Sequence, residues 1–85
     1  MVKITQEDIM LAALLARPID ELELTTRAYN GLKRTGTYTI AEMLVKLKTG
    51  DIHKLRNIGE KTVYDIQNEV RRYLEKYGYE VEGKA

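Results

Sequence analysis

The chemistry most accessible to this sequence is the binding of an anion at a turn. Residues 55–66 read LRNIGEKTVYDI, which is an apolar residue, a tight turn around Ile58 and Gly59, and the start of a long amphipathic helix. Glycine is favoured where the chain takes a positive φ or lets another backbone come close. The first turn of that helix would hold residues 60–62, and its unpartnered N–H groups can bind a phosphate. The sequence therefore predicts a hairpin that binds a nucleic-acid backbone, with a purely structural corner as the alternative.

A second basic residue near a predicted helix start occurs earlier in the sequence. Arg27 follows Thr25 and Thr26, either of which can cap a helix. The hairpin likewise places Lys61 near a helix start. Two such elements side by side would bind the phosphates on both sides of one groove, which is a hypothesis from the pattern alone.

Composition excludes most other kinds of site. The chain has 85 residues, no cysteine and a single histidine, His53. Disulfides, thiolate metal sites and most histidine-based zinc sites are therefore excluded, and no acid–base pair suggests catalysis. No apolar run approaches the roughly 18 residues of a membrane span. We expect one small intracellular domain, outside the membrane, with no catalytic residues, metal or cofactor.

The charges are unevenly distributed along the sequence. Residues 1–23 carry two basic and five acidic residues, whereas residues 24–48 carry five basic residues and one acidic residue. An acidic entry followed by a basic middle suggests two surfaces with different partners. Ordinary solvated charge on helix faces is the alternative, and the charges alone favour it.

The first half of the sequence predicts two helices joined by an arm. Thr5 and Asp8 have the spacing of a capping box, and the apolar helix that follows should end before Pro18. Residues 17–25, RPIDELELT, indicate an ordered extended arm whose apolar residues are anchors and whose acidic residues face outward. A helix over residues 26–34 should follow, ended by Gly36.

The second half predicts further helices. Thr39 and Glu42 form a capping box, and Gly50 should end the helix that they begin. A short helix over residues 51–55 precedes the hairpin. The last helix, from about Glu60 to Gly78, should bury one face that is made of Val63, Ile66, Val70, Tyr73, Leu74 and Tyr77.

These elements indicate an all-α fold, a compact bundle of four to five short helices with a helix-hairpin-helix-like element and an ordered N-terminal arm. We divide the sequence into an N-terminal helix or linker over residues 1–16, a nucleic-acid-binding domain over 17–78 and a polar tail over 79–85.

The motifs resemble a known family. RPIDELELT (17–25), followed by Arg27 and Asn30, and then NIGEKTVYDI (57–66), resemble the C-terminal domain of the bacterial RNA polymerase α subunit over residues 15–78. The resemblance implies a bundle of four short helices after an ordered arm. It also implies binding to the minor groove of A·T-rich promoter DNA, and contacts with σ factor and transcription activators.

The resemblance assigns roles to particular residues. It implies that Arg27 enters the minor groove and that Asn30 contacts DNA from the same helix. It places further DNA contacts at Lys54 and in the hairpin, at Asn57, Gly59, Lys61, Thr62 and Asp65. Thr62 and Asp65 replace the family's usual serine and glutamate. The resemblance implies a surface for σ factor at Asp20, Glu21 and Glu23.

Three features depart from the family pattern. Gly31 stands where cysteine is usual and should loosen its helix by up to about 1 kcal/mol. Tyr29 is bulkier than the usual residue, and residues 41–53 diverge. The apolar helix over Thr5–Ala16 either packs on the domain or pairs with a partner, a second copy included.

An adaptor for other proteins and a helix-hairpin-helix module of a repair protein are the alternative functions. The protein is either an excised piece of a polymerase subunit or free-standing, and we expect it to be bacterial, cytoplasmic and associated with the nucleoid.

Overall fold

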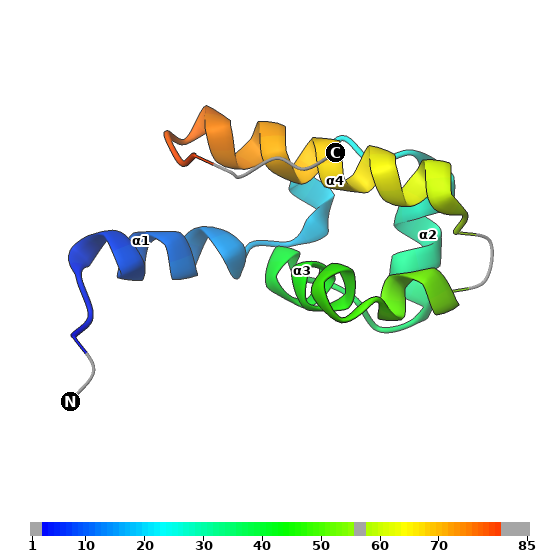
Figure 1. Ribbon diagram of the computed structural model, residues 1–85, viewed down its shortest axis with the longest axis horizontal. Helices are drawn as coiled ribbons and strands as arrows, with labels where there is room; N and C mark the ends of the chain where they lie inside the picture. The colour runs from blue at the N-terminus through cyan, green and yellow to red at the C-terminus, as the bar shows by residue number, and fades with distance from the viewer. Residues whose placement is uncertain (1–2, 56–57, 81–85) are drawn as a thin grey trace.

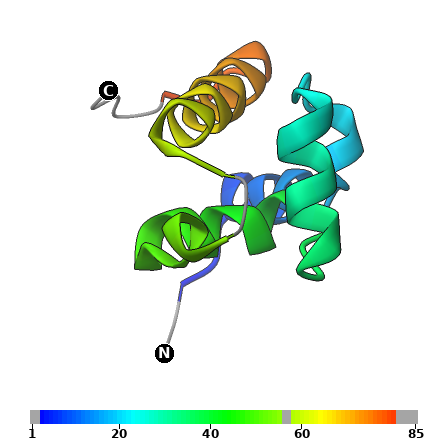
Figure 2. The same ribbon diagram turned by 90° about the vertical axis from the view of Figure 1, so that its right-hand side faces the viewer.

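The computed structural model describes residues 3–55 and 58–80, and every named element in that part of the protein is a helix. Four α-helices, α1 (Gln6–Leu15), α2 (Thr26–Arg34), α3 (Ile40–Thr49) and α4 (Glu60–Lys76), are joined by two short 3₁₀ helices, η1 (Ile19–Glu21) and η2 (Asp51–Lys54). In Figures 1 and 2, α2, α3 and α4 surround one centre, and α1 extends away from it. The predicted all-α fold is confirmed.

Threonines begin three of these helices. The side chains of Thr5, Thr25 and Thr39 each accept a hydrogen bond from an N–H in the first turn of α1, α2 and α3. Both predicted capping boxes are present. The Glu42 carboxylate accepts N–H groups from Tyr38 and Thr39 at 2.9 Å each, and these bonds lower its pKa. Local sequence signals therefore fix these helix starts.

The core lies where α2, α3, α4 and both 3₁₀ helices meet. Its fully buried apolar side chains are Ile19, Leu32, Ile40, Met43, Ile52 and Ile66. The predicted inner face of α4 is confirmed apart from Tyr77, whose side chain is 48% exposed. Tyr77 is the C-cap of α4, at the end of the helix, and its ring packs edge to face with that of Tyr73, with 5.2 Å between the ring centroids.

The arm is less extended than predicted. Pro18 and Leu22 have extended backbones, but η1 lies between them. The Ile19 N–H donates to the carbonyl of Tyr38, and the Ile40 N–H donates to that of Arg17, at 2.9 Å each. Ile19 and Leu22 are the buried anchors, whereas Leu24 is half-buried. The arm therefore takes its shape from long-range pairing with the segment that enters α3, which its own sequence could not specify.

Helix α1 is only partly covered by the domain. Leu14 is buried and Leu11 and Leu15 pack against the core, while Ile9 and Met10 are 60% and 58% exposed. The inner part of this helix thus packs on the domain, which is one of its two expected behaviours, and its outer part is exposed. Within the described residues, no helix is long and apolar enough to cross a membrane.

Candidate nucleic-acid interface

One face of α2 carries the polar side chains expected to contact DNA. Arg27 and Asn30 are exposed and one helical turn apart, and with Gly31 and Arg34 they line one shallow hollow. The ion pairs and side-chain hydrogen bonds found among the described residues do not include Arg27, Asn30 or Arg34. These three side chains can therefore bind a ligand without breaking a bond of that kind.

Gly31 joins this face to the hairpin. The Ile58 side chain is buried, and a Cβ added at Gly31 would lie 3.0 Å from its Cδ1 atom and 3.2 Å from its Cγ1 atom. Since real Cβ atoms rarely come that close, glycine lets the hairpin pack directly on α2. Gly31 thus allows a close contact between the two halves of the candidate site.

The start of α4 lies beside this contact. Gly59 is its N-cap, and no side chain of the described residues caps the helix. The glycine has a φ of −92°, and no atom of the described residues comes within 4 Å of the position of a Cβ. The expectation of a positive φ or a close backbone is therefore wrong within this molecule. Gly59 instead exposes its backbone to solvent.

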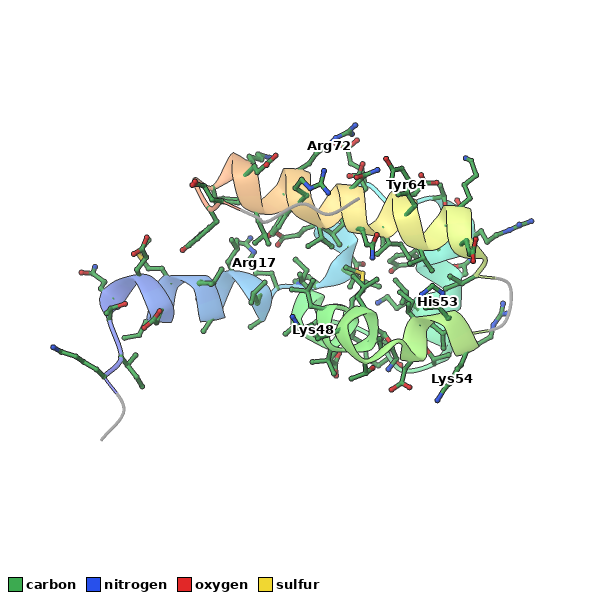
Figure 3. All side chains as sticks on the ribbon, viewed as in Figure 1. Arg17, Lys48, His53, Lys54, Tyr64 and Arg72 are labelled. Atoms are coloured by element: carbon green, nitrogen blue, oxygen red, sulfur yellow. The ribbon has the colours of Figure 1, made fainter. Side chains whose placement is uncertain are left out.

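The remaining hairpin residues differ in how they are held. Lys61 Nζ lies 3.8 Å from Asp65 Oδ2, although the Lys61 side chain is 91% exposed. Thr62 is half-buried in the first turn of α4. Lys54 Nζ lies 3.3 Å from Asp51 Oδ1, and Figure 3 shows the Lys54 side chain pointing outward from η2. Asn57 lies outside the described residues.

Comparison with known proteins identifies the family. Residues 5–72 match the family of C-terminal domains of the bacterial RNA polymerase alpha subunit. The protein belongs to this family. It is 46% identical over 66 residues to a DNA-directed RNA polymerase subunit alpha of Rubrobacter xylanophilus, 44% identical over 63 residues to that of Frankia alni, and 47% identical over 57 residues to that of Malacoplasma penetrans.

These alignments include only part of each relative. They span 78%, 74% and 67% of the present sequence, but 20%, 18% and 17% of the respective subunits. The sequence thus spans about a fifth of the length of the polymerase subunits that it matches. The similarity concerns their C-terminal domain and not the whole subunit.

The acidic residues of this α C-terminal domain differ in availability. Asp20 accepts a hydrogen bond from the Tyr29 hydroxyl at 2.9 Å and lies 3.5 Å from Lys33 Nζ. Glu21 accepts from Arg17 Nε at 2.7 Å and from the Tyr73 hydroxyl at 2.6 Å. Both carboxylates are at the surface, as predicted, but they bind side chains of their own domain. The ion pairs and side-chain hydrogen bonds of the described residues do not include Glu23, which is exposed beside a groove that Asp65 and Glu69 also line.

The Tyr29 side chain also has a structural role in this α C-terminal domain. Lys33 Nζ lies 5.2 Å from the centre of the Tyr29 ring and 5.0 Å from that of Tyr38. Two cation–π contacts and the Asp20 carboxylate therefore hold Lys33. Its amino group faces the arm, so Lys33 is less available to a ligand than Arg27 or Arg34.

The Glu21 cluster predicts a specific dependence of stability on pH. The hydrogen bond from Tyr73, followed by that from Arg17, lowers the pKa of Glu21 below its ordinary value of 4.5. Ionised Glu21 therefore stabilises the fold above about pH 4.5, and this contribution is lost as pH falls through the lowered pKa. Tyr73→Phe should raise that pKa towards 4.5. The gap in melting temperature between wild type and variant should be widest at pH 7 and should narrow below about pH 4.

Circular dichroism melts between pH 7 and pH 3 measure this gap. Tyr64→Phe is the matched control, because Tyr64 is exposed on α4 and its hydroxyl is not among the side-chain hydrogen bonds of the described residues, whereas that of Tyr73 is. A gap for Tyr73→Phe that stays constant over the whole range would show that the hydroxyl does not act through Glu21.

Sequence reasoning singled out three of the four residues that line the α2 hollow, but not Arg34. The available signal was spacing, because a residue seven positions after Arg27 returns to the same helix face. Among the described residues, no group of three or more His, Cys, Asp or Glu side chains could hold a metal ion.

Proposed function

We propose that this domain is a non-catalytic DNA-binding module that grips the minor groove of A·T-rich promoter DNA with α2 and the start of α4. The observation that carries the proposal is the hollow in which Arg27 and Asn30 lie exposed, outside the ion pairs of the described residues. Ile58 packs the hairpin against this face through Gly31. Membership of the polymerase α C-terminal domain family supports a role in transcription.

The chemistry of Arg27 suits a narrow groove. A·T-rich minor grooves are narrow and strongly negative, so they attract an inserted guanidinium. Arginine enters more readily than lysine because it is less strongly hydrated and has a planar fork of donors. Asn30 can donate to the N3 and O2 acceptors of the groove or to the sugar–phosphate backbone. Because A·T and T·A pairs present the same acceptors there, the domain should prefer A·T richness to one exact sequence.

The start of α4 would hold the backbone of the same DNA. The open side of Gly59 lets a phosphate approach the first N–H groups of α4, where the helix dipole favours an anion. The nearly fully exposed Lys61, whose Nζ lies 3.8 Å from Asp65 Oδ2, can add a charge contact. The Thr62 hydroxyl can donate to the same phosphate, and Lys54 and Asn57 remain predicted contacts beside it.

The arm is the proposed site for proteins of the transcription machinery. We assign RNA polymerase, σ factor or activators to the surface at Asp20, Glu21 and Glu23, in the bacterial cytoplasm where promoter DNA lies. Glu23 is the most available of the three, because the other two carboxylates bind Tyr29, Arg17 and Tyr73. Basic side chains are the expected counterparts.

A titration followed by NMR tests the proposed function. ¹⁵N-labelled domain is titrated with an A·T-rich and a G·C-rich duplex of equal length. Shifts should cluster at Arg27, Asn30, Gly59 and Lys61, and should saturate at lower concentrations of the A·T-rich duplex. No shifts with either duplex, or shifts confined to α1, would contradict the proposal.

The second candidate function is protein–protein binding through α1. The helix would pair either with a second copy of this domain or with another protein, for which the domain would be an adaptor. The specific observation is that Ile9 and Met10 are mostly exposed, and that Met10 lines a hollow with Tyr77 and Tyr79. Light scattering separates the two candidates. A monomeric mass at high concentration together with DNA binding would exclude self-association as the main function.

A further inference from the structure

We propose that Arg34 is a second DNA-binding arginine of this domain, and that its guanidinium binds a phosphate on the wall of the groove that Arg27 enters. This inference rests on the proposed function, because it extends the same face. Neither the family resemblance nor the hairpin signal assigned a role to Arg34.

The position of Arg34 places it on the DNA face. Seven residues are almost two full helical turns, so Arg34 follows Arg27 on the same side of α2, about 10.5 Å further along the axis. Both side chains line the hollow that also contains Asn30 and Gly31. The two arginines therefore stand at opposite ends of one exposed surface.

The Arg34 guanidinium is free to bind a ligand. The residue is exposed, and the ion pairs of the described residues do not include it. Its neighbour Lys33, by contrast, lies 3.5 Å from Asp20 and over two tyrosine rings. Of the three basic residues on α2, Arg27 and Arg34 are thus the two with no carboxylate beside them in the described structure.

Other groups already satisfy the C-terminal end of α2. The Leu32 carbonyl accepts the Thr35 hydroxyl at 2.9 Å and the Thr37 N–H at 3.0 Å. The Lys33 carbonyl accepts the Gly36 N–H at 3.0 Å. Arg34 is therefore not needed as a cap. Its charge instead offsets the negative end of the helix dipole, which would otherwise repel an approaching phosphate.

The distance between Arg27 and Arg34 along α2 favours contact of Arg34 with a phosphate rather than with the base edges at the floor of the groove. A B-DNA minor groove is about 6 Å wide. With α2 lying across the groove, a side chain that starts about 10.5 Å along the helix from Arg27 would reach the groove wall when Arg27 occupies the groove. Binding to phosphate is independent of sequence and releases counterions, whereas a groove contact depends on base composition.

Binding as a function of salt tests the proposal. Affinities of wild type, Arg34→Gln, Arg34→Lys and Lys48→Gln for A·T-rich and G·C-rich duplexes are measured by fluorescence anisotropy at several salt concentrations. Arg34→Gln should weaken binding about three- to tenfold on both duplexes and reduce the slope of log K against log[salt] by about 0.9. Arg34→Lys should keep the slope. Lys48→Gln is the charge-matched control, because Lys48 lies in the last turn of α3 and does not line the α2 hollow.

The outcomes separate this inference from the proposed function. An unchanged salt slope for Arg34→Gln, in a domain whose DNA binding depends on Arg27, overturns the role of Arg34 alone. A fall in the A·T preference of Arg34→Gln overturns the assignment to phosphate. Wild-type protein that binds neither duplex overturns the proposed function and this inference with it.

Discussion

Replacement of Arg27 by alanine is expected to weaken binding to A·T-rich duplex DNA by about 10- to 150-fold, the range that follows from losing hydrogen bonds worth about 1.5–3 kcal/mol to a charged group. The Arg27 guanidinium is exposed in the α2 hollow and lies outside the ion pairs of the described residues, so its removal should not unfold the domain. The preference for A·T-rich over G·C-rich DNA should fall as well, because the groove-reading side chain is lost.

Fluorescence anisotropy with both duplexes measures this loss, and two variants serve as controls. Arg27→Lys should bind more weakly than wild type, since an ammonium is more strongly hydrated and lacks the planar fork. Arg72→Ala removes an arginine whose Nη1 lies 3.2 Å from the Glu69 carboxylate, and it should change affinity little. Normal binding by Arg27→Ala would place the DNA-binding surface elsewhere.

Replacement of Ile58 by alanine should cost about 2–5 kcal/mol of unfolding free energy, as for other buried large-to-small changes. The side chain is 5% exposed and connects the hairpin to α2 at Gly31. A small domain has only about 5–15 kcal/mol of stability in total, so the loss is a large fraction of it. Urea unfolding measures this effect. DNA affinity in the absence of urea should also fall, because the hairpin is no longer held against α2.

A double-mutant cycle tests whether the Gly31–Ile58 contact is responsible. Gly31→Ala adds a methyl group that must displace Ile58 Cδ1, which offsets the gain in helix propensity of up to about 1 kcal/mol. Ile58→Val removes that Cδ1 atom. The double variant should be more stable than the sum of the two single changes predicts. Additive effects would show that the two side chains do not share the same space.

The sequence predicted well the starts and ends of the helices, because these depend on residues that are close together in the sequence. Thr25 and Thr39 cap α2 and α3. The glycines that follow the ends of α2, α3 and α4 have positive φ values, namely Gly36, Gly50 and Gly78. The parts it predicted poorly depend on residues far apart. Tyr73 donates to Glu21 across 52 positions, and the arm pairs with the segment before α3.

The candidate site divides in the same way. The resemblance to the family selected Arg27 and Asn30, and their spacing of one helical turn predicts that both lie on one face of α2. The packing of Ile58 on Gly31 was not predictable, because it depends on how the hairpin folds back. The expected conformation of Gly59 was wrong. A glycine at a turn can indicate either a positive φ or a backbone that is open to solvent, and the sequence does not distinguish the two.

The bonds of the arm also determine how a protein partner would bind there. A basic side chain that approaches Glu21 has to replace Arg17 or share the carboxylate with it, so the contact is an exchange whose net free energy is a difference between two similar ion pairs. The same exchange at Asp20 would release Lys33 from its carboxylate. Since Lys33 belongs to α2, a partner on the arm would leave the positive charge of Lys33 without its Asp20 counter-ion on the helix that carries Arg27. By linkage, DNA on that helix would then alter the affinity of the arm for its partner by the same factor.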